Sequence, residues 1–345
     1  MTTPWHRIEA FAAQFSRCAV TPGETAVVLT ETESRPALVE AATMALAFLG
    51  ARPVTVTLPT PPNLGPVAIR STGASVALAG HPAALAALKS ADFVVDCTVE
   101  GLLHAPELPE ILGGGARVLM ISNEHPEVFD RLGYDPTLEG RVRRGRDILA
   151  AATQMRVTSA AGTDLTIDLT DAVCAGSAGV VTEAGDIAHW PGGLVLAFPA
   201  ADTVNGTVVM APGDVNLTFK EYLRSSVTLT LENDFVTNVV GHGLDADLFS
   251  SYLAAWQEPD AYAISHVGWG MNHQCRWDAL PLYDKSDING TELRAFAGNF
   301  LWSTGANETA NRFCRGHFDL PMRNCTVTLD GQPVVVDGRL VEGLS

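Results

Sequence analysis

The chain is poor in basic residues. Its 345 residues include 22 lysines and arginines against 39 aspartates and glutamates, which gives a formal net charge of −17 at pH 7. Three of the basic residues are lysines: Lys89, Lys220 and Lys285. Nucleic acids and anionic membrane surfaces are bound through clustered positive charge. We therefore expect neither of them as a partner.

Cysteine pairs and long apolar stretches are also missing. The six cysteines are widely spaced and none belongs to a C-x-x-C pair, which argues against a disulfide framework. No uninterrupted apolar run reaches the ~18–20 residues that a membrane span requires. The segment Met1–Glu9 contains a proline, a histidine, an arginine and a glutamate, which is not the pattern of a secretory leader. These features predict a cytoplasmic protein.

Common nucleotide-binding and hydrolase motifs are absent as well. The sequence contains neither G-x-x-x-x-G-K-S/T nor G-x-S-x-G. The glycine run at 113–115 follows a predicted helix rather than a strand, so we interpret it as a turn and not as a dinucleotide-binding loop. We therefore expect the first half of the chain to be a scaffold rather than a cofactor-binding domain.

What the chain does contain is enough hydrophobic sequence for two cores. Hydrophobic residues make up 47% of it and charged residues 18%. Because single cores rarely grow beyond ~250–300 residues, the length favours two domains. We place the boundary where the sequence pattern changes, which gives residues 1–154 and residues 155–345.

Residues 1–154 alternate short β-branched runs with Ala/Leu-rich stretches of helical spacing. Strands that alternate with helices indicate βαβ units and a mostly parallel sheet, so we predict an α/β domain. The predicted strands are Thr25–Thr30, Pro53–Leu58, Phe93–Cys97 and Val118–Ile121; the predicted helices are Pro36–Leu49, Pro82–Ser90, Pro106–Leu112, Pro126–Leu132 and Leu138–Gln154.

Residues 155–345 have a different pattern, in which strand-like runs dominate and glycine-rich turns separate them. This pattern is typical of an antiparallel, β-rich α+β domain. One helix is predicted, at Ala246–Trp256. The predicted strands are Leu165–Leu169, Leu194–Phe198, Thr207–Met210, Ser226–Leu231, Val236–Val240, Cys325–Leu329 and Pro333–Val336.

Two histidines and an aspartate form the most informative pattern. His317 and Asp319 lie two residues apart in a strand-like run, so their side chains point to the same face. His266 lies in a second apolar run, just before glycines. Together they make up the two-histidine, one-carboxylate set that suits non-haem Fe(II) with open positions. A hydrogen-bonded His–Asp pair and a core histidine are the structural alternatives.

Two further histidines lie in candidate pocket loops. His189 and Trp190 stand in a glycine-rich segment together with Glu183, a combination that indicates either a pocket loop or a tight turn with the tryptophan in the core. His104 follows the predicted strand Phe93–Cys97, and loops after parallel strands face the usual site crevice. His104 is therefore a candidate base; a histidine at a helix start is the alternative.

Taken together, these segments resemble the 2,5-dihydroxypyridine 5,6-dioxygenases of nicotinate degradation, which share a fold with the M29 aminopeptidases. The resemblance extends over nearly the whole chain, and the combination of motifs is far more specific than any one of them. The most specific stretches are His189-Trp190-Pro191, Ser265-His266-Val267-Gly268-Trp269-Gly270, Gly298-Asn299-Phe300-Leu301, Ser303-Thr304-Gly305 and His317-Phe318-Asp319.

The resemblance implies that Fe(II) is held by a facial triad, to which His266, His317 and Asp319 correspond. It also implies a histidine base, a small aromatic substrate and O₂, both atoms of which enter as the ring opens to an N-formylmaleamic acid type of product. A homo-oligomer is expected. The catalytic candidates are His104 and His189, and the substrate-binding candidates are Glu183, Trp190, His273, Ser303 and Thr304.

His273 departs from the related patterns. The resembling peptidases place a metal-associated tyrosine seven residues after the first metal-binding histidine, where this chain has His273. A fourth metal ligand, a substrate contact and an exposed residue all remain open for it. Which of His104, His189 and His273 is the base is also open, as is the choice between iron and manganese.

Leu194 separates the two enzyme classes that this resemblance suggests. The peptidases bind two metal ions and use extra glutamates, one of which aligns by pattern with Leu194, a residue that cannot bind a cation. Its loss removes charge that a second divalent ion needs, which favours a single iron. The alternative hypotheses are an M29-like metallo-aminopeptidase and a non-catalytic binding protein that keeps the cleft.

Overall fold

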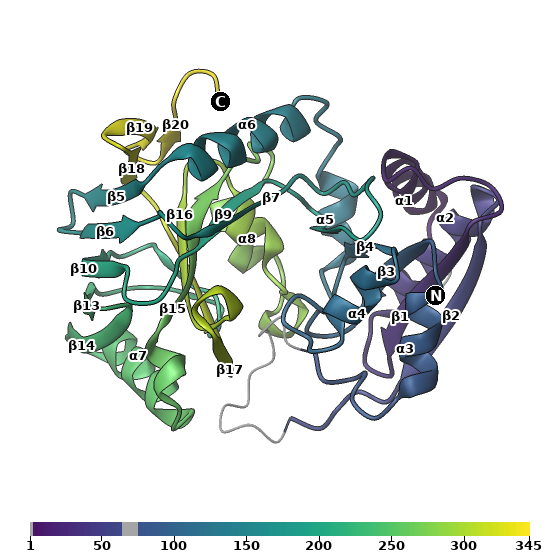
Figure 1. Ribbon diagram of the computed structural model, residues 1–345, viewed down its shortest axis with the longest axis horizontal. Coiled ribbons are helices and arrows are strands. Elements are labelled where there is room, and N and C mark those ends of the chain that lie inside the picture. The colour runs from purple at the N-terminus through teal and green to yellow at the C-terminus, as the bar shows by residue number, and fades with distance from the viewer. Residues whose placement is uncertain (1–2, 64–74) are drawn as a thin grey trace.

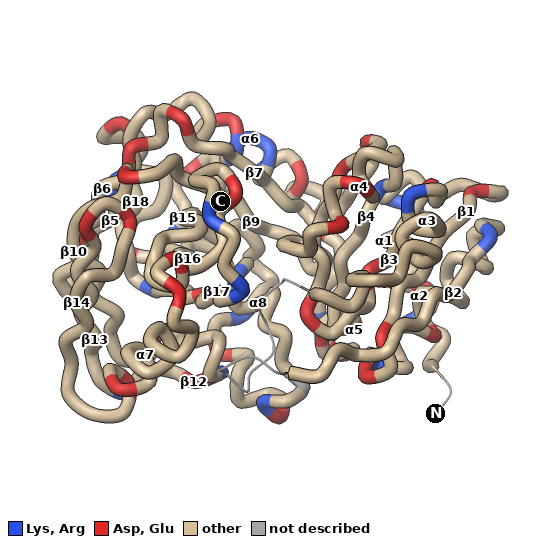
Figure 2. Tube along the Cα trace, turned by 60° about the horizontal axis from the view of Figure 1, so that its bottom comes forward, with Lys and Arg blue, Asp and Glu red and all other residues tan. Residues whose placement is uncertain are grey.

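The computed structural model describes residues 3–63 and 75–345, and it consists of two parts that lie side by side (Figure 1). The first part contains a parallel sheet and the second contains antiparallel sheets. This confirms the predicted fold class, an α/β part followed by a β-rich α+β part. Acidic residues are distributed over both parts (Figure 2).

The first part is built around a five-stranded parallel sheet with the order β2-β1-β3-β4-β8. The central strand β3 is buried along its whole length, as expected for a parallel strand that is covered on both faces. The strands are β1 (Thr25–Glu31), β2 (Arg52–Leu58), β3 (Phe93–Cys97), β4 (Arg117–Met120) and β8 (Ile187–His189).

Helices cover both faces of this sheet. Successive strand residues point to opposite faces, so Val28 of β1 packs in the core under α1, α2 and α5, and Val27 packs in the core under α3 and α4. Four of these helices have proline in the first turn, where its missing N–H costs nothing. The helices are α1 (Trp5–Arg17), α2 (Pro36–Phe48), α3 (Pro82–Lys89), α4 (Leu108–Gly113) and α5 (Pro126–Arg131).

The second part contains two antiparallel sheets that share one large core with α6 (Leu138–Ala151) and α7 (Leu244–Ala255). The eight-stranded sheet has the order β14 (Phe235–Gly241), β13 (Val227–Glu232), β10 (Val204–Met210), β6 (Asp164–Asp168), β5 (Gln154–Ser159), β18 (Cys325–Leu329), β19 (Gln332–Val336) and β20 (Arg339–Leu340). The five-stranded sheet has the order β17 (Arg312–Met322), β16 (Phe300–Asn307), β15 (Ile264–Gly270), β9 (Leu194–Phe198) and β7 (Val173–Ser177).

Shorter elements join these sheets. Strands β11 (Val215–Asn216) and β12 (Glu221–Tyr222) form a small ladder, and helix α8 (Thr291–Ala295) precedes β16. Short 3₁₀ turns occur at Pro259–Tyr262, Trp277–Leu282, Lys285–Asp287 and Glu308–Ala310. Among the described residues, no helix combines the length and apolar character that crossing a bilayer needs.

The chain passes between the two parts more than once. Helix α6 belongs to the first half of the sequence, yet its Val142 and Leu149 lie in the core of the second part. Strand β8 belongs to the second half of the sequence, yet it pairs with β4 at the edge of the first sheet. The division at residue 154 stays a prediction, and the two parts are joined through α6 and β8 on either side of it.

Candidate metal and substrate site

Strands β15 and β17 of the five-stranded sheet, which flank β16, bring the predicted triad together. His317 and Asp319 are two residues apart on β17, so their side chains share a face, while Phe318 and Leu320 point into the core. His266 stands on β15, on the other side of β16. All three side chains are buried.

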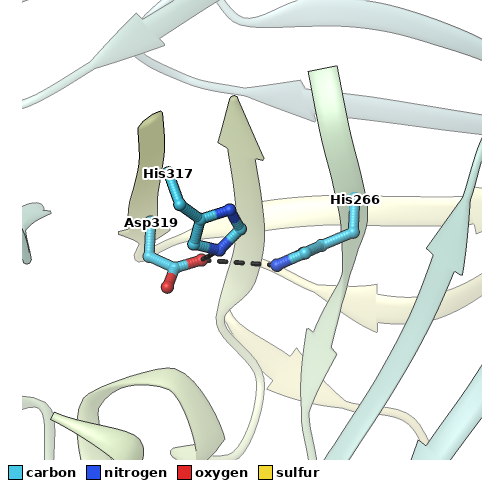
Figure 3. A group of neighbouring side chains, drawn as sticks. All are labelled: His266, His317 and Asp319. Atoms are coloured by element: carbon cyan, nitrogen blue, oxygen red, sulfur yellow. Dashed lines mark ion pairs between the residues drawn. The ribbon is translucent and has the colours of Figure 1, made fainter. Parts of the chain in front are cut away.

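The three side chains converge on a single carboxylate oxygen (Figure 3). Oδ1 of Asp319 lies 3.2 Å from Nε2 of His317 and 3.4 Å from Nε2 of His266. One ligand atom from each of the three residues lies within 4.8 Å of the others. Two ligands that sit ~2.1 Å from an octahedral ion at right angles to each other are about 3 Å apart. The observed spacing therefore fits adjacent positions around one metal ion.

Hydrogen bonding in the triad supports the same interpretation. Oδ1 of Asp319 is buried and has no hydrogen-bond partner among the described residues, and neither has Nδ1 of His266 or of His317. A buried polar atom without a partner is costly. An oxygen aimed at the space between two imidazoles fits a two-histidine, one-carboxylate metal site.

The charges around the triad suit a cation ligand set. Burial works against ionisation of Asp319, but the charge of Arg294 and the two neighbouring imidazoles together outweigh it and hold the pKa of that carboxyl well below its usual range. Nε of Arg294 donates to Oδ2 of Asp319 at 2.6 Å, so Oδ1 is the oxygen that faces the two imidazoles. Burial lowers the pKa of His317 to about 4, so its imidazole is neutral at pH 7 and keeps a lone pair for a metal.

A cavity of about 150 Å³ opens beside the triad and is lined by both parts of the molecule. The parallel sheet contributes its carboxyl edge: His104 follows β3, Met120 ends β4, and His189 ends β8. This is the edge at which open α/β sheets usually bind ligands. The antiparallel part contributes the triad, Arg294 and an apolar wall. That wall is formed by Leu194, Leu196, Phe198 and Leu301.

Both predicted catalytic histidines reach this cavity. The ring of His104 lies 5.0 Å from the ring of His317, centroid to centroid. Burial, together with the charge of Arg294, lowers the pKa of His189 to about 3, so His189 is neutral at physiological pH. The backbone N–H of His189 donates to Oγ of Ser177 at 3.0 Å, which fixes the end of β8 against the wall of the cavity.

Ser303 and Thr304 have different surroundings, although they are adjacent on β16. Ser303 pairs directly with Asp319, so its side chain is on the triad face of the sheet, where its hydroxyl accepts from the N–H of His266 at 3.2 Å. Thr304 pairs with Phe318 and shares that residue's opposite face. Ser303 therefore lies behind the triad, and Thr304 is turned away from it.

None of the five predicted substrate contacts belongs to the described cavity lining: Glu183, Trp190 and His273 lie outside it, as do Ser303 and Thr304. Trp190 packs in the core of the first part, 4.3 Å from the ring of Phe129. Its neighbour His189 points the other way, because successive residues of an extended chain face opposite sides. Glu183 is exposed, and so is His273, whose Nε2 is 3.5 Å from Oγ of Ser345.

Sequence reasoning missed two charged residues of the site. Arg294 lines the cavity and pairs with Asp319 across 25 positions of sequence. Glu308 lies 3.4 Å from Nδ1 of His104. Neither residue belongs to a motif. The chain has few basic residues, so each arginine was a candidate partner for a buried carboxylate. No other sequence feature pointed to Arg294, the ion-pair partner of Asp319.

Comparison with known proteins gives the family of the chain. A family model described as 2,5-dihydroxypyridine 5,6-dioxygenase matches residues 6–342. A relative of that name from Pseudomonas putida KT2440 is 36% identical over 323 residues, which cover 92% of this chain and 91% of the relative. The solved structure of 2,5-dihydroxypyridine dioxygenase from that bacterium superimposes with a TM-score of 0.92, at 35% identity, over 97% of each chain.

The fold also extends to a more distant protein. AmpT from Thermus thermophilus matches with a TM-score of 0.64 at 13% identity, over 97% of this chain and 99% of its own, which shows a shared fold alone. The architecture is thus the expected M29 aminopeptidase-like one. The chain belongs to the 2,5-dihydroxypyridine 5,6-dioxygenase family. This membership does not favour the aminopeptidase alternative.

Proposed function

We propose that the chain is a mononuclear, Fe(II)-dependent dioxygenase that opens the ring of 2,5-dihydroxypyridine or a close hydroxylated aromatic compound. The product would be of the N-formylmaleamic acid type. The observation that carries the proposal is the buried Oδ1 of Asp319, which lies between two imidazoles and has no hydrogen-bond partner among the described residues, at the wall of a cavity that two more histidines line. The names of the relatives support the same chemistry.

The residues of the triad would hold the metal ion. His266, His317 and Asp319 supply three ligands, and Arg294 keeps Asp319 ionised and oriented through its other oxygen. When bound, Fe(II) supplies open coordination positions for the substrate and O₂. The fit of the triad to one ion, with Leu194 on the cavity wall in place of an acidic side chain, supports a single metal per chain.

The cavity suits one aromatic ring. A cavity of about 150 Å³ is of the size that holds a benzene-sized molecule. The leucines of its apolar wall would contact the ring face, while the histidines would contact its polar substituents. This division favours a small, uncharged aromatic ring that carries hydroxyl groups.

His104 is the candidate base. Its Nε2 is buried without a partner among the described residues, and its ring lines the cavity beside His317. A ring hydroxyl placed there could pass its proton to Nε2. His189, neutral because of burial, would donate or accept a hydrogen bond to hold the substrate.

The test is a metal and turnover measurement on the same sample. Protein purified without oxygen and loaded with Fe(II) should contain one iron per chain and consume O₂ with 2,5-dihydroxypyridine. Parallel loading with Mn(II) decides between the two metals. No O₂ uptake across a panel of hydroxypyridines and hydroquinone-like acids would overturn the proposal. Location in the cytoplasm and assembly into a homo-oligomer remain predictions.

A further inference from the structure

The two nitrogens of His104 have different surroundings. Nδ1 lies 3.4 Å from Oε1 of Glu308. Nε2 is buried and has no partner among the residues that the structure describes. The side chain of His104 is 4% exposed and lines the cavity, whereas that of Glu308 is 52% exposed. Nδ1 therefore faces a carboxylate near the surface, whereas Nε2 is buried.

Glu308 is held in place by the hairpin that also carries two triad residues. It begins the 3₁₀ turn Glu308–Ala310 between β16 and β17. Asn307, which is fully buried, fixes this turn: its Oδ1 accepts from the N–H of Ala310 at 3.3 Å, and its Nδ2 donates to the carbonyl of Pro199 at 2.8 Å. The same hairpin continues to His317 and Asp319. Glu308 thus links His104, from the first part of the molecule, to the element that carries the triad.

A carboxylate acceptor beside one ring nitrogen selects the tautomer of a neutral histidine. The proton stays on the nitrogen that faces the carboxylate, and the other nitrogen keeps its lone pair. The hydrogen bond to His104 is also the main reason why the pKa of Glu308 is lowered, so Glu308 is ionised at neutral pH. Both effects direct the free lone pair of His104 to Nε2.

We infer that Glu308 is a positioning residue, which holds His104 with its proton on Nδ1 and its unprotonated Nε2 available to a substrate in the cavity. The inference rests on the proposed function insofar as His104 is the base. A contribution to folding does not account for the pair, because ion pairs with a half-exposed member add little to stability. Glu308 should therefore affect turnover and the tautomer of His104, and leave the melting temperature nearly unchanged.

The first measurement is the tautomer itself. Full-length, metal-free protein labelled with ¹⁵N-histidine gives long-range ¹H–¹⁵N spectra that distinguish a proton on Nδ1 from a proton on Nε2, and the H104Q variant assigns the signal. We expect the Nδ1–H form in the wild type and a mixture, or the Nε2–H form, in E308A. The isosteric E308Q variant keeps an oxygen acceptor and should retain the wild-type tautomer.

The second measurement is a double-mutant cycle on the Fe(II)-loaded enzyme. E308A should lower kcat about 10- to 100-fold, within the range known for residues that orient a catalytic or metal-bound histidine, with KM within about threefold. E308Q should recover most of the loss. In an H104Q background, E308A should have no further effect, because Glu308 acts through His104. E110A, which removes another exposed carboxylate from an ion pair with Lys89, is the matched control.

Three results would overturn the inference: wild-type kcat in E308A, an equal loss in the H104Q background, or an unchanged His104 tautomer in E308A. Failure of the proposed function gives a different result. In that case the wild type consumes no O₂, or H104Q turns over like the wild type, while the tautomer in the metal-free protein still reports on Glu308.

Discussion

The two parts of the molecule contribute to the site in different ways. The antiparallel part carries His266, His317 and Asp319 within strands whose backbones are paired with neighbours. The parallel part contributes His104 from a loop and His189 from the last position of a short edge strand. Sites on strands are more precise than sites on loops. Metal ligands need that precision, whereas groups that meet a substrate can tolerate some adjustment.

The loop of His104 is nevertheless well anchored. Asp96, near the end of β3, is fully buried and accepts hydrogen bonds from the N–H and the hydroxyl of Thr98 and from the N–H of Leu102. These bonds fold the chain back just before His104. The two parts therefore hold their site residues differently. Paired strands hold the triad in the antiparallel part, and the buried carboxylate of Asp96 anchors the loop of His104 in the parallel part.

The largest expected effect comes from replacing a triad residue that stands on a strand. Replacing His317 by Ala removes one of the three proposed ligands, so metal content should fall to near zero and O₂ uptake with it, while the fold is retained. Metal analysis after reconstitution and an oxygen electrode check this. H273A is the matched control, since His273 is an exposed histidine outside the described cavity lining. Wild-type metal content in H317A would contradict the proposed triad.

Replacing His104, on the loop, should have a smaller effect, which falls on kcat rather than on metal content. H104Q should keep one metal per chain but lose about 10²- to 10⁴-fold in kcat, the range of general acid–base catalysis. Steady-state O₂ consumption and metal analysis on the same preparation separate the two parts of the site. If H104Q loses its metal, the proposal that the strand residues hold the metal without help from His104 is wrong.

A third prediction concerns the anchor of that loop. Burial raises the pKa of Asp96 to about 6, against about 4 in an unfolded chain. The folded state thus binds this proton more tightly, and the stability that Asp96 contributes is present below pH 4 and lost as the pH rises to about 6. The free energy of unfolding of the wild type, relative to D96N, should fall over that window by about 2 kcal/mol. Urea unfolding at pH 4, 5, 6 and 7 measures it, and a flat or rising difference would contradict it.

The smallest effect is expected on the far face of β16. The hydroxyl of Thr304 is buried without a partner among the described residues, so T304V should be neutral or stabilising by about 1 kcal/mol and leave turnover unchanged. S303A, one residue away, removes the acceptor for the N–H of His266 and should destabilise by about 1–2 kcal/mol. Urea unfolding of both variants compares the two faces, and a larger loss in T304V would reverse this assignment.

Site residues that are placed by local strand geometry could be predicted from the sequence, whereas contacts between distant elements could not. The spacing of His317 and Asp319 put both on one strand face, because strand geometry is set by adjacent residues. The same alternation removed Trp190 from the cavity, although the sequence places it beside His189. The ion pair of Arg294 with Asp319 depends on the packing of α8 against β17, which no local pattern encodes.

The fold shows the same limits. Strands β1, β3 and β4 were predictable because each is a run of apolar residues bounded by turns. The three-residue strand β8 was not predicted, since it is too short to show a period and pairs with a strand far earlier in the sequence. The predicted helix Leu138–Gln154 ends at Ala151, and Gln154 instead begins β5, where its partner strand determines its conformation.

A ribosome releases this chain from its N-terminus, so the outer edge of β4 stays bare until residues 187–189 emerge. That is about 70 residues after β4 ends, or several seconds at the usual ~5–20 residues per second. An uncovered strand edge is a template for pairing with other chains. We therefore expect a nascent chain that stops short of β8 to be prone to aggregate. Strand β8, which covers this edge, ends in His189, a residue that lines the cavity. Pairing of β8 with β4 therefore completes the first sheet and places His189 at the cavity in one step.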